Sequence, residues 1–124
     1  MADSLGFTEE TREYDNLIAG DFPIVTKEGT LLTGQNLTRG TLLGRVTASK
    51  KYVKSLAASS DGSEVPTAIL AEDKDATSED KKVMIYLTGE YNDNKVTFGT
   101  GHSAASTRDG LRAKSIFLKT PVKA

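Results

Sequence analysis

The stretch "LTRGTLLGRVTASKKY", residues 37–52, contains the pattern that decides the fold. Residues 42–48 alternate between two sets of side chains with a period of two residues, which is typical of a β-strand. Gly44 lies inside this strand, where a glycine often marks a bulge or the close approach of another backbone. Gly34 and Gly40 precede the strand, and we expect both at turns.

The rest of the chain continues this arrangement of short strands separated by turns. Period-two runs and short apolar segments predict further strands at residues 24–25, 31–32, 65–71, 83–88, 95–98 and 115–119. We expect a turn at residues 27–29, a hairpin turn at residues 92–94, and Gly89 at a turn or bulge. Residues 103–112 predict one or two turns of helix. The pattern indicates a mainly β fold, a compact barrel or sandwich of short strands with at most one or two short helices.

Residues 1–22 differ from the rest of the chain and form a predicted N-terminal arm. They are acidic and rich in small or polar residues, and their apolar side chains are thinly spread. The apolar spacing allows a short helix over residues 8–18, but a helix of that length is marginal on its own in water. We expect an arm that is mobile until it finds a partner, followed by a single β-rich domain at residues 23–124. The alternative is a terminal element that packs on its own domain.

Composition limits the classes to which the protein can belong. The 124 residues suit one domain, and 37% apolar residues without tryptophan give a small core, so further burial through self-association is expected. A formal charge of −1 argues against a dedicated duplex-binding protein. The absence of cysteine excludes disulfides, thiolate zinc sites and cysteine nucleophiles. Because no run of 18 apolar residues and no signal peptide are found, we expect no membrane contact and synthesis in a cytoplasm.

The motifs of the chain predict no catalytic residue, no metal and no cofactor. The glycines of the opening stretch lack the Lys-Ser/Thr pair that completes a phosphate-binding loop. Residues 71–82 imitate the first half of a calcium-binding loop, but Ser78 and Met84 stand where glycine and glutamate are required. His102 is the only histidine of the sequence, and no nucleophile motif surrounds any serine.

Aromatic and basic residues leave one other binding function open. Single-stranded nucleic acid is bound by aromatic stacking faces beside a basic groove. The residues that fit this description are Tyr52, Tyr86, Tyr91 and Phe98, with a cluster of Lys50, Lys51 and Lys54. Acidic residues follow soon after this cluster and weaken the idea. The alternative function is therefore a small β-barrel adaptor that binds single-stranded nucleic acid or protein.

Four segments, taken in order, resemble one known family. They are "LTRGTLLGRVTASKKY", "DGSEVPTAILAEDKDAT", "VMIYLTGEYNDNKVTFG" and "LRAKSIFLK". The series is similar to the lambda-type bacteriophage head decoration protein D family over most of residues 23–120. The succession of "RGTLLGRV" and "AILAED" is its most specific part, and the chain length and the absence of cysteine also fit.

The resemblance implies a β-clip-like, mainly β subunit that assembles as a homotrimer. In that family the trimer binds the outside of the expanded phage head at local three-fold positions and cements neighbouring capsid subunits. The resemblance thus implies the major capsid protein as partner, no enzymatic activity, no nucleic-acid or membrane partner, a place in the virion, and synthesis in the host bacterial cytoplasm. A nucleotide-hydrolysing β-clip enzyme is disfavoured, because none of its Asp- and Gly-based motifs are found.

The family's N-terminal arm contacts the major capsid protein, which implies the same role for the arm of this chain. An extended arm can add a strand to an exposed sheet edge. Leu5 and Phe7 lie on the same side of such a strand, and we expect them to be the buried pair. Thr8 and Tyr14 complete the predicted contact residues. The acidic segment "TEETREYD" departs from the family pattern.

Overall fold

The computed structural model describes residues 17–120, which fold into nine strands and one helix. The strands are β1 (Thr26–Leu31), β2 (Gln35–Leu37), β3 (Leu42–Arg45), β4 (Tyr52–Lys54), β5 (Pro66–Leu70), β6 (Lys74–Ala76), β7 (Lys81–Tyr86), β8 (Gly89–Asn92) and β9 (Ile116–Lys119), and the helix is α1 (Ala104–Arg112). The prediction of a mainly β fold with at most one or two short helices is confirmed.

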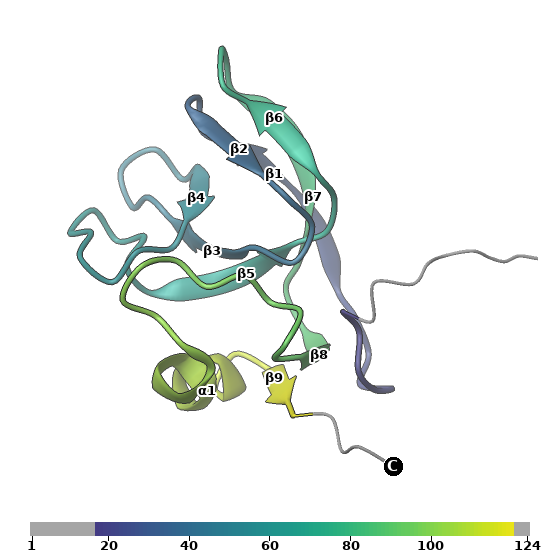
Figure 1. The fold of residues 1–124 in the computed structure, drawn as a ribbon. Helices are drawn as coiled ribbons and strands as arrows, with labels where there is room; N and C mark the ends of the chain where they lie inside the picture. The colour runs from purple at the N-terminus through teal and green to yellow at the C-terminus, as the bar shows by residue number, and fades with distance from the viewer. Residues whose placement is uncertain (1–16, 121–124) are drawn as a thin grey trace, which may run out of the picture.

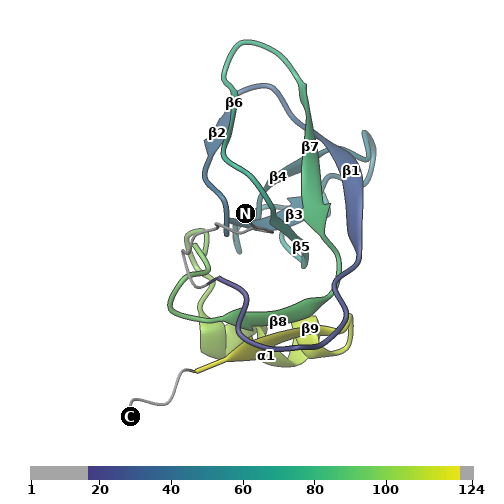
Figure 2. The same cartoon turned by 90° about the vertical axis from the view of Figure 1, so that its right-hand side faces the viewer.

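Five strands form a closed barrel in the order β1-β4-β3-β5-β7, and antiparallel pairing of β1 with β7 closes it. β2 and β6 form a two-stranded antiparallel sheet, which Figure 1 shows at one end of the barrel. β8 and β9 form a parallel pair beside α1 at the opposite end, as Figure 1 and Figure 2 show. The barrel therefore lies between the β2–β6 sheet and a layer made of β8, β9 and α1.

β3 and β5 are buried on both faces and separate two hydrophobic cores. The barrel core consists of Leu31, Leu43, Tyr52, Ala68, Leu70, Ala76, Val83 and Ile85. The outer core, between the barrel and the β8–β9–α1 layer, consists of Leu17, Leu42, Ile69, Tyr91, Val96, Leu111, Ile116 and Leu118. The adjacent residues Leu42 and Leu43 are both fully buried, although they belong to different cores. Burial on both faces explains why apolar side chains follow one another directly at Leu42–Leu43 and Ala68–Leu70, although the flanking residues alternate with a period of two.

β1 runs straight through the predicted turn at residues 27–29, so that prediction is wrong. All six residues of β1 pair one by one with β7. Gly29 lies within the strand because an aromatic ring covers it: an added Cβ would lie 3.0 Å from the ring of Tyr52. This glycine therefore serves close packing and makes no turn.

The predicted hairpin between residues 83–88 and 95–98 is also wrong. β8 leaves the barrel and pairs in parallel with β9, and residues 95–98 form no strand beyond an isolated bridge at Thr97. Burial decides this arrangement, because Tyr91 of β8 is completely buried in the outer core. Gly89, with a φ of +136°, begins β8 in a conformation that favours glycine.

α1 confirms the helix predicted over residues 103–112. Ser103 is its N-cap and accepts a hydrogen bond from the N–H of Ser106, whose hydroxyl accepts one from the N–H of Ser103. This reciprocal capping satisfies backbone groups at the start of the helix. Leu111 is buried in the outer core, so the helix covers the side of β5 that faces away from the barrel core.

Gly44 lies where the pairing of β3 with β5 shifts register. A Cβ added there would lie 1.9 Å from the carbonyl oxygen of Ser63. The same oxygen accepts a hydrogen bond of 2.7 Å from the hydroxyl of the buried Ser55, which fixes the loop backbone against the strand. Only glycine leaves room for this contact.

We predict that Gly44→Ala destabilises the protein by at least about 2 kcal/mol, because a backbone oxygen cannot move aside without separating the loop from the strand. Gly110→Ala is the matched control: nothing lies within 4 Å of its added Cβ, and alanine in a helix interior should stabilise by about 0.5–1 kcal/mol. Urea unfolding of both variants measures the two changes. Equal stabilities would contradict the close approach at Gly44.

Candidate functional site

Residues 17–22, here called the anchor segment, tie the start of the described chain to β8. Leu17 is only 1% exposed and belongs to the outer core. Its carbonyl accepts a hydrogen bond of 2.7 Å from the N–H of Asn92. Ile18 forms a bridge with Tyr91, but its own side chain stays 39% exposed. The chain that precedes Leu17 therefore starts from a fixed point on the molecule.

The remainder of the anchor segment follows the β8–β9 pair. The N–H of Ala19 donates to the carbonyl of Glu90 at 2.8 Å. Phe22 packs edge-on against Phe117 of β9, with 4.9 Å between the ring centroids. Figure 2 shows the segment running along β8 and β9 before the chain turns into β1. These contacts hold the anchor segment at both of its ends.

The turn at Gly40 packs against the side chain of Leu17. Gly40 has a φ of +96°, and an added Cβ would lie 2.8 Å from the carbonyl oxygen of Lys95 and 3.5 Å from the Leu17 side chain. Arg39 stabilises the same turn, because its guanidinium donates to the Ala71 carbonyl at 3.0 Å. Gly34, in the turn before β2, has a φ of +95°. The predicted turn glycines thus lie beside the anchor segment and the barrel end.

Arg39 also contacts the aromatic pair that lines the outer core. Its guanidinium donates to the hydroxyl of Tyr86 and lies 5.4 Å from the centroid of that ring. Tyr86 in turn packs on Tyr91, whose hydroxyl donates to the Thr88 carbonyl at 2.7 Å. Burial raises the pKa of Tyr91, which keeps this phenol neutral and able to donate. The Tyr86–Tyr91 pair therefore stabilises the outer core, to which Leu17 also belongs.

The predicted arm divides at Leu17. Residues 17–22 pack on the domain, which corresponds to the alternative of a terminal element. Leu5, Phe7, Thr8 and Tyr14, the predicted contact residues, lie outside the described residues, and the arm role of residues 1–16 stays a prediction. The signal for the anchor was present in the sequence, because Leu17 is followed by Ile18 in a segment otherwise poor in large apolar residues.

His102 closes a loop contact and does not activate a serine. Its Nε2 lies 3.1 Å from the Ser55 hydroxyl and 3.1 Å from the Glu64 carbonyl. Ser55 donates its own proton to the Ser63 carbonyl, so Nε2 faces two acceptors and acts as a donor. Ser55 is also completely buried and out of reach of a substrate. The geometry is that of a structural clamp between two loops.

The acidic side chains within residues 71–82 accept hydrogen bonds from neighbouring groups of the protein. Asp75 accepts from the hydroxyl and N–H of Thr77, which lowers its pKa. Asp80 accepts from the Lys51 ammonium and from the N–H of Thr33 at 2.8 Å, and these bonds lower its pKa as well. Across residues 17–120, no group of three acidic or histidine side chains is placed to hold a metal ion.

The aromatic residues proposed for nucleic-acid stacking lie mostly inside the protein. Tyr52 is 6% exposed and Tyr91 is fully buried, while Phe98 packs against the outer core. Lys51 is paired with Asp80, so the lysine cluster is partly neutralised. Tyr86 is partly buried beside Tyr91, so these rings leave little free surface for stacking. In the same part of the chain, no helix has the length and apolarity needed to cross a bilayer.

Together, these features define a small β-barrel protein in which His102 and the acidic loop residues stabilise the fold and residues 17–22 are anchored on the outer core. The comparison with known families specifies this class. A family model described as bacteriophage lambda head decoration protein D matches residues 6–116, and the chain belongs to this family. The protein therefore decorates and binds the phage capsid as a structural component of the virion. The curated proteins contain no match.

We predict that Leu17→Ala lowers the free energy of unfolding by about 2–4 kcal/mol, because it leaves a cavity in the outer core. Ile18→Ala, one residue further along, is the control and should change it by less than about 1 kcal/mol because that side chain is partly solvated. Thermal and urea unfolding measure both. If the two variants were equally stable, Leu17 would not anchor the segment.

Proposed function

We propose that this protein is a homotrimer that binds the outer surface of the expanded phage head at local three-fold positions. The partner is the major capsid protein, and the protein is made in the host bacterial cytoplasm. Residues 1–16 form the arm that grips the shell, with Leu5 and Phe7 as the buried pair and Thr8 and Tyr14 as further contacts. The observation that carries this proposal is the burial of Leu17, which fixes the base of the arm on the outer core.

The anchor at Leu17 explains how an arm can act on a shell. A tension on the arm is passed through Leu17 to the outer core and from there to the barrel strands. The family match begins at residue 6, so it includes Phe7, Thr8 and Tyr14. An arm that adds a strand to an exposed edge of the shell gains backbone hydrogen bonds and specificity through alternate side chains.

Trimer formation multiplies a weak contact. An arm that orders on binding loses much of its gain to conformational entropy. If each arm binds at roughly millimolar strength, about −4 kcal/mol, three arms linked on one body raise the avidity by about 10²–10⁴. Exposed apolar side chains support self-association, because surfaces of this kind are covered in assemblies. The large ones are Ile18, Ile24, Val25, Leu56, Val65 and Met84.

Stabilisation of the shell follows from selective binding. A protein that binds only the expanded lattice stabilises that lattice by about 2.7 kcal/mol per site at a 100-fold excess over its dissociation constant. A trimer that spans neighbouring subunits distinguishes the expanded from the unexpanded shell, because expansion changes the spacing of the sites it must reach together.

We predict that the double variant Leu5→Ala/Phe7→Ala weakens decoration of expanded heads by at least about a hundredfold, because each lost side chain is worth roughly 1.5–3 kcal/mol when buried. Ser4→Ala is the control in the same segment and should decorate normally. Co-sedimentation with heads and electron microscopy measure binding, and analytical ultracentrifugation measures the trimer, which both variants should keep. Full decoration by the double variant, or a wild-type protein that sediments as a monomer, would contradict the proposal.

A further inference from the structure

A cleft lies beside β1 and β4, which are neighbouring strands of the closed barrel but pair over little of their length. The two strands are bridged only where Leu31 meets Tyr52. The cleft has a volume of about 450 Å³. Its lining residues are Lys27, Arg45, Thr47, Lys50, Tyr52, Gly62, Thr67 and Leu87.

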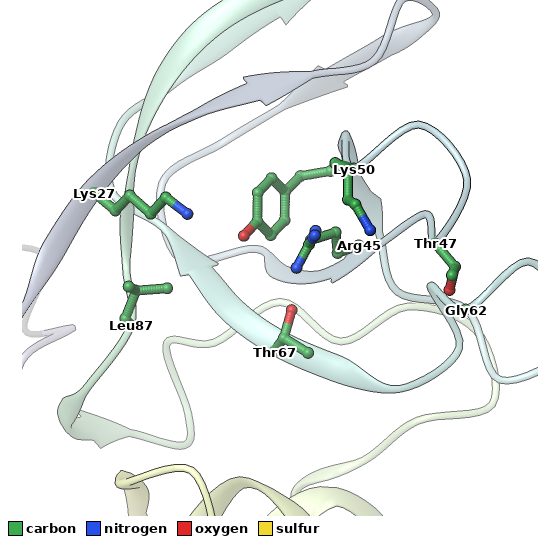
Figure 3. Close-up of a pocket in the computed structure, with 8 residues that line it drawn as sticks. Lys27, Arg45, Thr47, Lys50, Gly62, Thr67 and Leu87 are labelled. Carbon is green, nitrogen blue, oxygen red and sulfur yellow. The ribbon is translucent and has the colours of Figure 1, made fainter.

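Three cations converge in the cleft without a counter-ion from the described chain. Figure 3 shows the side chains of Lys27, Arg45 and Lys50 reaching into the same space. No carboxylate among residues 17–120 forms an ion pair with any of them. Like charges held together repel one another, and the repulsion is relieved when an anion enters.

Two further features of the cleft indicate a ligand. The Thr67 hydroxyl, which Figure 3 shows pointing into the cleft, is the only buried side-chain polar atom in residues 17–120 without a hydrogen-bond partner. Lys50 has a φ of +65°, where glycine or asparagine is the ordinary choice. An unsatisfied hydroxyl and a strained lysine backbone both lower the stability of the fold. A bound anion would accept a hydrogen bond from the Thr67 hydroxyl and pair with the Lys50 ammonium.

The edge of β1 that borders the cleft is unpaired. The N–H of Leu87 donates to the carbonyl of Val25 at 2.8 Å, so the odd-numbered residues direct their backbone groups at β7. By the alternation of antiparallel pairing, Thr26 and Glu28 direct theirs away from β7, at the cleft. Neither pairs with a second strand within the described residues, and both are exposed. Such an edge accepts an added strand.

We propose that this cleft receives residues 9–15 of a neighbouring copy of the chain as a strand added to the edge of β1. The proposal rests on the trimer of the proposed function and assigns one of its contacts. Strand addition supplies the backbone hydrogen bonds, and the cations supply the selection for an acidic sequence. The apolar tip of the donated arm, with Leu5, Phe7 and Thr8, stays available for the shell, and Tyr14 is reassigned from the shell to the neighbouring copy.

The acidic face of residues 9–15 fits the charge of this cleft. In an extended strand, Glu9, Glu13 and Asp15 share one face, and this face meets the three cations. Glu10, Arg12 and Tyr14 share the opposite face. Because Lys27 lines the cleft, the next residue, Glu28, lies on the outer face of β1, where it meets Arg12.

Residues 9–15 that enter the cleft come from a different copy of the chain. The anchor segment of the same copy lies too far from the cleft for its own arm to reach it. Asp15 stands two residues before Leu17, and two extended residues span about 7 Å. Leu17 packs beside β8, and Figure 1 shows the anchor segment on the side of the β1–β7 pair that faces away from β3 and β4, the strands that carry the cleft residues Arg45 and Tyr52. When each copy donates its acidic strand to the next, the head-to-tail contact closes into a ring.

Charge reversal in the full-length chain tests this pairing. Arg45→Glu and Glu13→Arg, each alone, should raise the dissociation constant of the trimer at least about tenfold, because each places like charges in contact. The two reversals combined in one chain should recover most of the loss. Sedimentation equilibrium measures the trimer, and amide hydrogen exchange at Thr26 and Glu28 measures strand addition. Both amides should be protected in the wild-type trimer and exposed in either single variant.

Two controls separate the cleft from general charge and folding effects. Lys114→Glu makes the same charge change at an exposed lysine outside the cleft and should leave the trimer unchanged. Lys50→Gly removes a cleft cation and relieves its backbone strain, so it should weaken the trimer while raising the free energy of unfolding measured at concentrations where the protein is monomeric.

Three outcomes would overturn the proposal: single reversals no stronger than Lys114→Glu, a combined variant that is not rescued, or unprotected amides at Thr26 and Glu28 in the trimer. Protection that persists in a monomer would assign the strand to the same chain and would also overturn it. In the first three cases the trimer and its decoration of heads still stand. A wild-type protein that never trimerises would instead contradict the proposed function itself.

Discussion

The structure depends on two central strands that are buried on both faces. β3 and β5 carry Leu43 and Ala68 into the barrel core and Leu42 and Ile69 into the outer core. All four side chains are completely buried. If either core came apart, β3 and β5 would become exposed, and the other core would lose the side chains that these strands contribute to it. This constraint joins the barrel to the β8–β9–α1 layer, and the anchor segment rests on the outer core that results.

A decoration protein needs a rigid body and a contact that transmits force. The rigid body is the doubly packed barrel, and the proposed contact begins at Leu17, which belongs to the same outer core as Leu42. The polar groups near the surface loops are engaged with backbone partners, as the bonds of Asp75 and Asp80 show. The cleft cations differ, because the side chains of Lys27, Arg45 and Lys50 form no ion pair within residues 17–120. The cleft is therefore the feature of the described surface that most needs a partner.

The sequence predicts the elements whose signal is a local residue pattern. It does not predict the elements whose position depends on contacts between residues far apart in the chain. The helix predicted over residues 103–112 is present as α1, and the strand predicted over residues 42–48 is present as β3, which already ends at Arg45 because residues 47–49 form a turn. The turn expected at residues 27–29 rests on a glycine that in fact makes room for the Tyr52 ring. The hairpin expected after residue 88 ignores the burial of Tyr91, which draws β8 to a strand far along the chain. Parallel pairing of β8 with β9 leaves no local signal in the sequence, since it depends on residues more than 20 positions apart.

The candidate site was predictable only in part, for the same reason. The acidic, arm-like composition of the leading residues is readable directly, and so is the cluster of lysines near Tyr52. The cleft combines Lys27 from β1 with Arg45 from β3, and only the closed barrel brings these cations together.

Native-state hydrogen exchange tests most directly whether the barrel and the outer layer form one cooperative body. The N–H of Leu70, bonded to the Thr41 carbonyl, reports on the barrel, and the N–H of Asn92, bonded to the Leu17 carbonyl, reports on the outer layer. The account predicts that both amides exchange with the same free energy and that this value equals the free energy of global unfolding. Exchange of Asn92 at a value several kcal/mol lower would show that the outer layer opens independently, which would contradict the account.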